Sequence, residues 1–418
     1  MSIFLSYWKG YHLDSTNLEV DKMEKTIAIN AGSSTLKFKL FEMPEETTIS
    51  SGQVDRIGIE GSNFVIKTPD GKKVEIDKPI KDHEEAVNLL LEQLLKLKII
   101  KSYDEITGVG HRVVAGGEIF TDATLIDDKV LQQIEALKEY APLHNGANAV
   151  GIKAFKKVLP NITSVAVFDT SFHQTLPEKN YLYSIPYEYY TDYGARKYGA
   201  HGTSHQYVSK RAAKLMGRPL EELDLITMHL GAGASITAVK GGKSFDTSMG
   251  FTPLAGITMA TRSGDIDASL VSFLERKLEL SPDEMSTILN NKSGLLGISG
   301  VSPDLRDIED EKDNGNHRAE LAVDIFVNNI VKYIGSYAAE MGNVDGIVFT
   351  AGIGENSWKM RKRIGAALKL FNVKIDLDVN QNGKGERFIN AEDSGIKVMV
   401  IPTNEELAIA QQVERFKK

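Results

Sequence analysis

Residues 26–41, with the sequence TIAINAGSSTLKFKLF, restrict the possible folds of this chain more than any other stretch. They predict a strand, a tight turn over residues 30–34 and a second strand, because apolar residues alternate with lysines after the turn. Gly32 can adopt a positive φ and admit a ligand close to the backbone. The polar groups of the turn, with the ammonium of Lys37, could then contact a phosphate chain. An ordinary hairpin with a polar turn is the alternative, since short motifs often match by chance.

A second stretch of the same kind lies at residues 225–240, with the sequence LITMHLGAGASITAVK. It again predicts a strand, a glycine-rich turn and a strand. An internal similarity of this kind indicates that the chain contains two related halves. We therefore expect an α/β protein in which two similar halves face each other across a cleft.

Ten stretches in one order resemble the family of acetate kinases, within the superfamily that includes sugar kinases, heat-shock ATPases and actin. They run from Lys25 to Leu407 and are INAGSSTLKF, HRVVAGGE, FDTSFH, YGAHGTSH, HLGAGAS, DTSMGFTPL, TRSGDID, SGLLGISGVSPDLRDI, FTAGIGEN and PTNEEL. Any one of them alone would be weak, but ten in order are highly specific. The resemblance implies an α/β fold of two duplicated actin-like (ribonuclease H-like) domains that flank a central cleft.

The 418 residues exceed the length of a typical single hydrophobic core, so two domains are expected. We expect an N-terminal actin-like domain at residues 23–172, to which a C-terminal helix at 405–418 returns. A nucleotide-binding domain is expected at 173–404, with the boundary near Phe172. Residues 1–22 lack a signal-peptide pattern. We interpret them as a vector-derived or upstream-start extension outside the fold, with a partner-binding arm as the alternative.

Composition excludes several classes of function. The net charge of −8 argues against broad nucleic-acid binding. The absence of cysteine excludes disulfides and thiolate nucleophiles, and it fits a reducing compartment. No apolar run approaches the roughly 18 residues that span a bilayer. We therefore expect a cytoplasmic protein without nucleic-acid or membrane partners. Neither a P-loop nor the protein-kinase motif set occurs, so phosphates must be held by scattered glycine turns.

The resemblance places ATP on three glycine-containing or charged segments and on one lysine. Glycines let a phosphate approach the backbone closely, and a helix N-terminus is expected after the last turn. Taken alone, the GIGEN stretch would more often be a simple loop between a strand and a helix. The implied residues are Lys37, His229, Leu230, Gly231, Ala232, Gly233, Asp304, Leu305, Arg306, Gly352, Ile353, Gly354, Glu355 and Asn356.

Two arginines are the strongest catalytic candidates. Arg112 lies in an apolar strand and Arg262 beside a helix start, and neither place suits an idle charge. Guanidinium binds carboxylate or phosphate oxygens bidentately and keeps its charge in a closed site. Solvated surface arginines are the alternative. The resemblance assigns both to catalysis, where they hold the acyl substrate and the transferring phosphoryl group.

The resemblance also makes His201 a donor to that phosphoryl group and Asp169 an essential residue. Asp169 follows a buried strand and could orient an arginine, handle a proton or a metal, or simply form a turn. His205, four residues after His201, could suggest a zinc pair. We set zinc aside because His201 is expected to precede the helix, where Thr203 or Ser204 would be the cap.

The remaining implied residues bind the metal and the acyl group. Asn30 and Glu405 match the positions for Mg²⁺, with Mn²⁺ as a substitute, and an amide with a carboxylate suits such a cation. Val114, Leu143 and Pro253 are expected to form a small apolar acyl pocket, or else to be core residues. The sequence departs from the common family pattern at several positions, including Ala200, Ala232, Ala260 and Pro303.

The hypothesis that the resemblance supports is reversible, Mg²⁺-dependent phosphoryl transfer from ATP to acetate. A propionate, butyrate or sugar kinase is the rival within the enzymes, and an actin-like assembly protein is the rival outside them. A homodimer is expected from the resemblance to the family, and also because the helical stretch 322–337 offers surplus apolar surface. The alternative for this stretch is a core helix. We also expect a packed aromatic connection at 182–193 and an acidic loop at 309–316.

Overall fold

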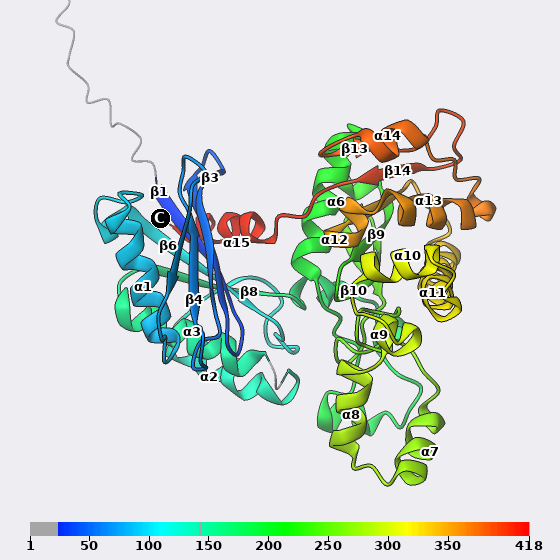
Figure 1. Cartoon of the computed structure of the whole chain (residues 1–418), viewed down its shortest axis with the longest axis horizontal. Helices are drawn as coiled ribbons and strands as arrows, with labels where there is room; N and C mark the ends of the chain where they lie inside the picture. The colour runs from blue at the N-terminus through cyan, green and yellow to red at the C-terminus, as the bar shows by residue number, and fades with distance from the viewer. Residues whose placement is uncertain (1–23, 142–143, 418) are drawn as a thin grey trace, which may run out of the picture.

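The computed structural model describes residues 24–141 and 144–417, so the extension at 1–22 and Leu143 lie outside the described residues. Two separate sheets, each accompanied by helices, lie side by side (Figure 1). Within the described residues, no helix combines the length and the apolar character needed to cross a bilayer.

The first sheet has the strand order β5-β4-β3-β2-β1-β6-β8-β7. Its central hairpin pairs Ile27 with Leu40 and Ile29 with Phe38, so the alternating apolar residues share one buried face. The strands are β1 (Glu24–Ala31), β2 (Leu36–Met43), β3 (Thr47–Asp55), β4 (Asn63–Lys67), β5 (Lys73–Asp77), β6 (Ile106–Val113), β7 (Thr124–Leu125) and β8 (Thr163–Phe168).

The second sheet has the order β11-β10-β9-β12-β14-β13. Strands β9, β10 and β12 are buried along most of their length, as in a sheet that is covered on both faces. The strands are β9 (Asp224–Leu230), β10 (Ala234–Lys240), β11 (Lys243–Thr247), β12 (Gly346–Thr350), β13 (Arg387–Phe388) and β14 (Lys397–Val400).

The two sheets share one topology. The order β3-β2-β1-β6-β8-β7 in the first sheet matches β11-β10-β9-β12-β14-β13 in the second. Each pair of neighbours also runs in the same relative sense: the central strand is antiparallel to its hairpin partner and parallel to the strand on its other side. The duplication predicted from the two hairpins is therefore confirmed.

The first hairpin turn differs in detail from the prediction. Strand β1 continues through Ala31, so the turn begins at Gly32, and Gly32 does not have a positive φ. Its N–H donates to the carbonyl of Thr35 at 2.8 Å, and an added Cβ would lie 2.7 Å from Thr35 Oγ1. Glycine is thus required by a close contact inside the turn and not by left-handed backbone.

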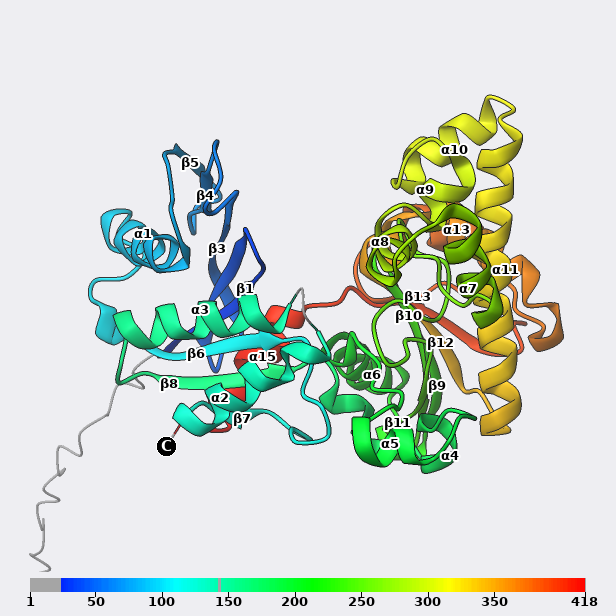
Figure 2. The ribbon, with the colours of Figure 1, turned by 90° about the horizontal axis from the view of Figure 1, so that it is seen from below.

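Helices cover both faces of each sheet (Figure 2). The first half contains α1 (His83–Lys96), α2 (Asp128–Ala136), α3 (Asn145–Val158) and the C-terminal α15 (Glu405–Glu414). The second half contains α4 (Glu178–Tyr181), α5 (Glu188–Tyr193), α6 (Gly202–Met216), α7 (Ala268–Leu278), α8 (Pro282–Asn291), α9 (Gly294–Ser299), α10 (Leu305–Asp313), α11 (His317–Met341), α12 (Ala351–Asn356), α13 (Trp358–Ala367) and α14 (Leu377–Asn382). The acidic loop expected at 309–316 is wrong, because α10 extends through Asp313.

The C-terminal helix α15 packs on the first sheet, although it follows the second sheet in the sequence (Figure 1). Two glycines of β6 make this close approach possible. An added Cβ at Gly110 would lie 2.3 Å from Ile409 Cγ2, and one at Gly108 would lie 2.4 Å from Val413 Cγ1. The helix therefore brings its first residue, Glu405, to the carboxyl end of the parallel strands.

The long helix α11 is a core element. Residues at helical spacing, including Phe326, Ile330, Ile334 and Tyr337, are buried against the second sheet and its neighbouring helices. The expectation that residues 322–337 offer surplus apolar surface is therefore wrong, since this half of the chain already covers that face.

The aromatic segment at 182–193 is not the packed connection that was expected. It directly follows α4 and contains α5, and most of its tyrosines face outwards. Tyr193, for example, is 69% exposed. An exposed aromatic surface of this kind is typical of an interaction site.

Candidate active site

The first part of the site lies where β1, β6 and β8 end. These strands are parallel, so Asn30, Arg112 and Asp169 come to the same edge of the first sheet. Asp169 accepts from Arg112 through both carboxylate oxygens: Nε lies 3.0 Å from Oδ1 and Nη2 lies 2.6 Å from Oδ2. Asp169 thus orients the guanidinium of Arg112, one of the roles considered for it.

The charges at this edge influence one another. Burial opposes the charged form of Arg112, but the carboxylates of Asp169 and Glu405 outweigh burial and raise its pKa. The pKa of Glu405 is raised to about 7, mainly by burial, while Arg112 lowers it and Asp169 adds to the rise. Glu405 therefore lies close to both members of the ion pair.

The second arginine comes from the loop between β11 and α7. Arg262 Nη1 donates to the carbonyl of Pro253 at 3.0 Å, and no carboxylate of the described residues is bonded to this guanidinium. Burial lowers its pKa. An added Cβ at Gly233 would lie 3.4 Å from His201 Nε2 and 3.7 Å from Arg262 Nη1. The glycine turn therefore allows the imidazole and the guanidinium to face one region.

His201 occupies the position immediately before α6, outside the helix as expected. Its backbone is left-handed, with φ 58°, which costs a residue with a Cβ about 1–2 kcal/mol. The prediction that Thr203 or Ser204 caps this helix is wrong, because both lie inside it. The ring of His201 stacks on His229, with centroids 4.1 Å apart and planes inclined by 22°.

The imidazole of His201 is held neutral. Burial lowers its pKa well below the ordinary value, and His229, Arg112 and Arg262 add to this effect. Burial also lowers the pKa of His229 to about 3, with a further contribution from Arg112. The N–H of Gly202, next to His201, donates to the carbonyl of Asp169 at 2.8 Å, so the start of α6 lies against the carboxyl edge of the first sheet. Among the described residues, no group of three His, Asp or Glu side chains could hold a metal ion.

A cavity of about 650 Å³ lies entirely in the second half. Its lining includes eight of the residues predicted to bind ATP, from three separate segments: Gly231, Ala232, Asp304, Leu305, Arg306, Gly352, Ile353 and Asn356. Sequence reasoning missed the remaining lining residues, which include Leu295, Trp358 and Lys359. Leu295 lies on α9, whereas Trp358 and Lys359 lie on α13, and only the packing of these helices near the glycine turn brings them to the cavity.

Three departures from the family pattern meet in this cavity. Ala232, Ala260 and Pro303 all line it, and the N–H of Ala260 donates to the carbonyl of Ala232 at 3.1 Å. The departures therefore alter one continuous wall, although they lie far apart in the sequence.

The GIGEN stretch is itself a helix and not a turn before one. It forms most of α12, which begins directly after β12. Glu355 Oε1 accepts from the backbone N–H groups of Ala351 at 2.8 Å and Thr403 at 3.1 Å, so this carboxylate supports the local backbone. Arg361, which sequence reasoning noted only as part of a basic helix, donates to the carbonyls of Gly354 and Glu355.

Several predicted residues lie elsewhere or beside this cavity. His229, Leu230 and Gly233 belong to the β9–β10 hairpin, and Leu230 is buried in the core. Lys37 is exposed on β2, where it borders a different hollow with Lys39, Lys67 and Lys73. The structure does not bring Lys37 to the cavity.

Val114 and Pro253, the two predicted acyl-pocket residues that the structure describes, lie close to the arginines in the sequence or in space. Val114 follows Arg112 by two residues, and Pro253 contacts Arg262. His144, which was not predicted, also lies near both arginines: burial lowers its pKa, with Arg112 and Arg262 as the next causes. The HxxxN spacing after α2, in which Asn148 Oδ1 accepts from the backbone N–H of Val114 at 3.2 Å, is the signal that could have found it.

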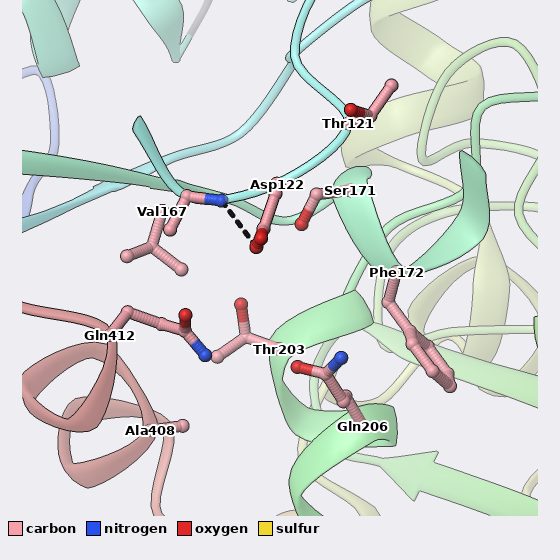
Figure 3. A pocket seen from close by; sticks show the side chains of 10 residues that line it. Thr121, Asp122, Val167, Ser171, Phe172, Thr203, Gln206, Ala408 and Gln412 are labelled. Atoms are coloured by element: carbon pink, nitrogen blue, oxygen red, sulfur yellow. Dashed lines mark hydrogen bonds between the residues drawn. The ribbon is translucent and has the colours of Figure 1, made fainter. Parts of the chain in front are cut away.

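A second, small hollow lies where the two halves and α15 meet (Figure 3). Its labelled side chains come from the segment before β7, from β8, from the short helical turn η3 (Ser171–Thr175), from α6 and from α15. None of the residues that line it is a predicted site residue, so the candidate site is the region between the paired arginines and the cavity of the second half.

Comparison with known proteins identifies the family. A family model described as the acetokinase family matches residues 25–411. The chain belongs to the acetokinase family. The acetate kinase of Limosilactobacillus fermentum (strain NBRC 3956 / LMG 18251) is 59% identical over 396 residues, 95% of this chain and 100% of that protein. The acetate kinase of Lactiplantibacillus plantarum (strain ATCC BAA-793 / NCIMB 8826 / WCFS1) is 61% identical and covers 94% and 99%.

Solved structures of the acetokinase family share the fold. Porphyromonas gingivalis acetate kinase matches with a TM-score of 0.90 and 44% identity, covering 94% of this chain and 100% of that one. A propionate kinase from Francisella tularensis subsp. tularensis SCHU S4 matches with a TM-score of 0.89 and 40% identity, with the same coverage. The expected two-part α/β fold is confirmed, and family membership makes the chain a phosphotransferase.

Proposed function

We propose that this chain is an acetate kinase, which transfers the γ-phosphoryl group of ATP to acetate and gives acetyl phosphate and ADP. The observation that carries the proposal is the approach of Arg112, Arg262 and His201 to one region beside the cavity of the second half. Both halves of the chain supply these groups, as is needed to bring an anion and a nucleotide together.

The chemistry needs charge neutralisation more than proton transfer. Acetate is already ionised at neutral pH, so its oxygen attacks phosphorus without a general base while the bond to ADP breaks. Catalysis then depends on in-line positioning and on donors that face the phosphoryl oxygens. Arg112, Arg262 and the N–H of His201 are those donors, each worth about 3 kcal/mol by analogy with oxyanion-hole groups.

Asn30 and Glu405 fit a magnesium site. They offer an amide and a carboxylate oxygen at the carboxyl edge of the first sheet, a donor set that suits Mg²⁺ with waters and phosphate oxygens as further ligands. When bound, Mg²⁺, or Mn²⁺ in its place, would neutralise phosphate charge. Asp169 holds Arg112 in place beside this site, and α15 positions Glu405 there.

We infer that the nucleoside of ATP occupies the cavity of about 650 Å³. The glycine turn at Gly231 supports this assignment, because it lies between the cavity and the imidazole of His201. The site roles of Lys37, His229, Leu230, Gly233, Gly354 and Glu355 stay predictions, as do the roles of Val114, Leu143 and Pro253 in acyl binding.

Hydroxylamine trapping of acyl phosphate tests the reaction. With ATP and Mg²⁺, we expect product from acetate in preference to propionate and butyrate. Preference for propionate would favour a propionate kinase, the activity named for the Francisella tularensis relative. ATP-dependent assembly of the chain without any acyl phosphate would instead favour an actin-like protein and contradict the proposal.

We also propose a homodimer that forms through α7. None of the residues of this helix is buried. Its apolar residues Leu270, Phe273 and Leu278 are 42%, 54% and 57% exposed and lie near one face. Sedimentation at micromolar concentration should show twice the mass of the chain, and Phe273→Glu should give the monomer. Leu370→Glu, at an 87% exposed leucine outside α7, is the matched control and should stay dimeric. An unmodified chain that sediments as a monomer would contradict the dimer.

The domain limits at residues 172 and 405 and the cytoplasmic location stay predictions. In support of the limits, the two sheets separate between β8 and α6, and α15 returns to the first sheet.

A further inference from the structure

A row of buried polar side chains lies behind His201. His201 Nδ1 is 2.9 Å from Ser235 Oγ, and the same hydroxyl is 2.8 Å from His205 Nε2. The other nitrogen of His205, Nδ1, is 2.7 Å from Thr227 Oγ1. Ser235, His205 and Thr227 have no exposed surface, so water does not compete for these hydrogen bonds.

The distances decide which way the hydrogen bonds run. A hydroxyl has one hydrogen to donate, so Ser235 can donate to only one of the two imidazoles. Besides His205, Thr227 Oγ1 has one further acceptor, the carbonyl of Thr237, at 3.5 Å, the limit of a hydrogen bond. The hydrogen of Thr227 therefore goes to His205 Nδ1.

The remaining hydrogens follow from donor and acceptor balance. Burial lowers the pKa of His205 well below its ordinary value, so this ring is neutral and carries one hydrogen. With Nδ1 of His205 accepting, its Nε2 donates to Ser235. The Ser235 hydroxyl then donates to Nδ1 of His201, which leaves the single hydrogen of neutral His201 on Nε2.

The geometry at His201 aims Nε2 into the site. An added Cβ at Gly233 would lie 3.4 Å from this nitrogen, on the side where Arg262 Nη1 also lies. The left-handed backbone of His201 and its stacking on His229 hold the ring in this orientation. A donor that is fixed before the reaction lowers the barrier more than one that must reorganise.

We propose that Ser235 is a positioning residue which, supported by His205 and Thr227, keeps His201 in the tautomer with hydrogen on Nε2 and so directs an N–H at the transferring phosphoryl group. The inference deepens the proposed function, because the role of the N–H depends on it. The hydrogen-bond direction itself depends on the described contacts and on the neutral state of the two buried rings, and not on the reaction.

Imidazole ¹⁵N NMR of the histidine-labelled protein, with His201 assigned from the spectrum of His201→Gln, tests the tautomer directly. We expect the unmodified protein to show hydrogen on Nε2 alone. Ser235→Ala should give a mixture of tautomers and lower kcat by about tenfold or more, with little change in KM for ATP. Ser235→Thr, which keeps the hydroxyl, should restore the single tautomer.

Ser209→Ala is the matched control. Ser209 is also buried without exposed surface, and its hydroxyl donates to the backbone carbonyl of His205 at 2.7 Å and not to the ring. We expect no change in the tautomer of His201 and kcat within about twofold of the unmodified value. If Ser235→Ala fails to fold, Thr227→Val keeps the test available, because it removes the hydrogen donated to His205 Nδ1.

Three results would overturn the inference: hydrogen on Nδ1 of His201 in the unmodified protein, an unchanged tautomer in Ser235→Ala, or a changed tautomer without a fall in kcat. Failure of the proposed function is distinguishable, because an unmodified protein that forms no acyl phosphate would still report its tautomer.

Discussion

Replacing Arg262 with alanine should lower kcat for acyl phosphate formation by about 100-fold or more. The guanidinium faces the same region as His201, and within the part of the chain that the structure describes its one bonded oxygen is the carbonyl of Pro253, which leaves donors for substrate oxygens. A donor that acts on the transition state affects kcat more than KM. Steady-state kinetics of purified, folded protein measure the effect.

Arg112→Ala should reduce kcat to a similar degree but is a less simple test. Removing this side chain leaves the carboxylate of Asp169, which is buried, without its partner. Loss of one member of a buried pair typically costs about 3–5 kcal/mol of stability. The free energy of unfolding of Arg112→Ala must therefore be measured beside its kinetics.

Lysine and a distant arginine provide the controls for this prediction. Arg262→Lys should recover only part of the activity, because an ammonium lacks the planar fork of guanidinium. Arg218→Ala removes an exposed ion pair with Asp345 and should leave kcat within about twofold. Near-normal turnover in folded Arg262→Ala would assign Arg262 a structural role instead.

Replacing Arg361 with methionine should lower the free energy of unfolding by about 3–5 kcal/mol, since it leaves buried acceptors unpaired. Arg361 is 2% exposed and donates to four oxygens. Nε lies 2.7 Å from Asn380 Oδ1 and Nη2 2.6 Å from the Asn380 carbonyl, while Nη1 lies 3.0 Å and 2.8 Å from the carbonyls of Gly354 and Glu355. None of these acceptors is a carboxylate.

Arg361 remains charged at neutral pH even though burial, with Arg387 as the next cause, lowers its pKa to about 10. The hydrogen bonds of Arg361 join the end of α12, which is predicted to contact phosphate, to α14. We expect Arg361→Met to raise KM for ATP as well, because α12 lines the cavity.

Urea denaturation followed by tryptophan fluorescence measures the loss of stability. Trp358 reports on this region directly, since its carbonyl accepts from Asn380 Nδ2 at 3.0 Å. Arg363→Met, on the same helix, is the matched control: Arg363 pairs with Asp324 at the surface, and its loss should cost less than about 1 kcal/mol. Equal effects of the two substitutions would show that burial of Arg361 contributes nothing special.

Local patterns were enough to predict the two hairpins, and the duplication followed from them. Alternation of apolar residues with period two reports which face of a strand is buried, and this depends on neighbours in sequence. The position of His201 before α6 was also predicted, although the expected caps, Thr203 and Ser204, lie inside the helix. The acidic run at 309–316 was misread because α10 buries only Leu305 and Ile308, too few apolar residues to show a helical period.

The sequence by itself determined the family and the α/β class and supplied the candidate reactive groups, because ordered motifs and local periodicity do not depend on distant contacts. Only the tertiary structure decided how those groups meet. Ser235 lies on β10 and His201 precedes α6, yet one hydroxyl joins His201 to His205. Such contacts depend on the packing of elements that are distant in the chain, which no local pattern records. The same reason explains why α11 proved to be core while α7 remained exposed: burial is a property of the assembled sheet and its neighbours, not of one helix.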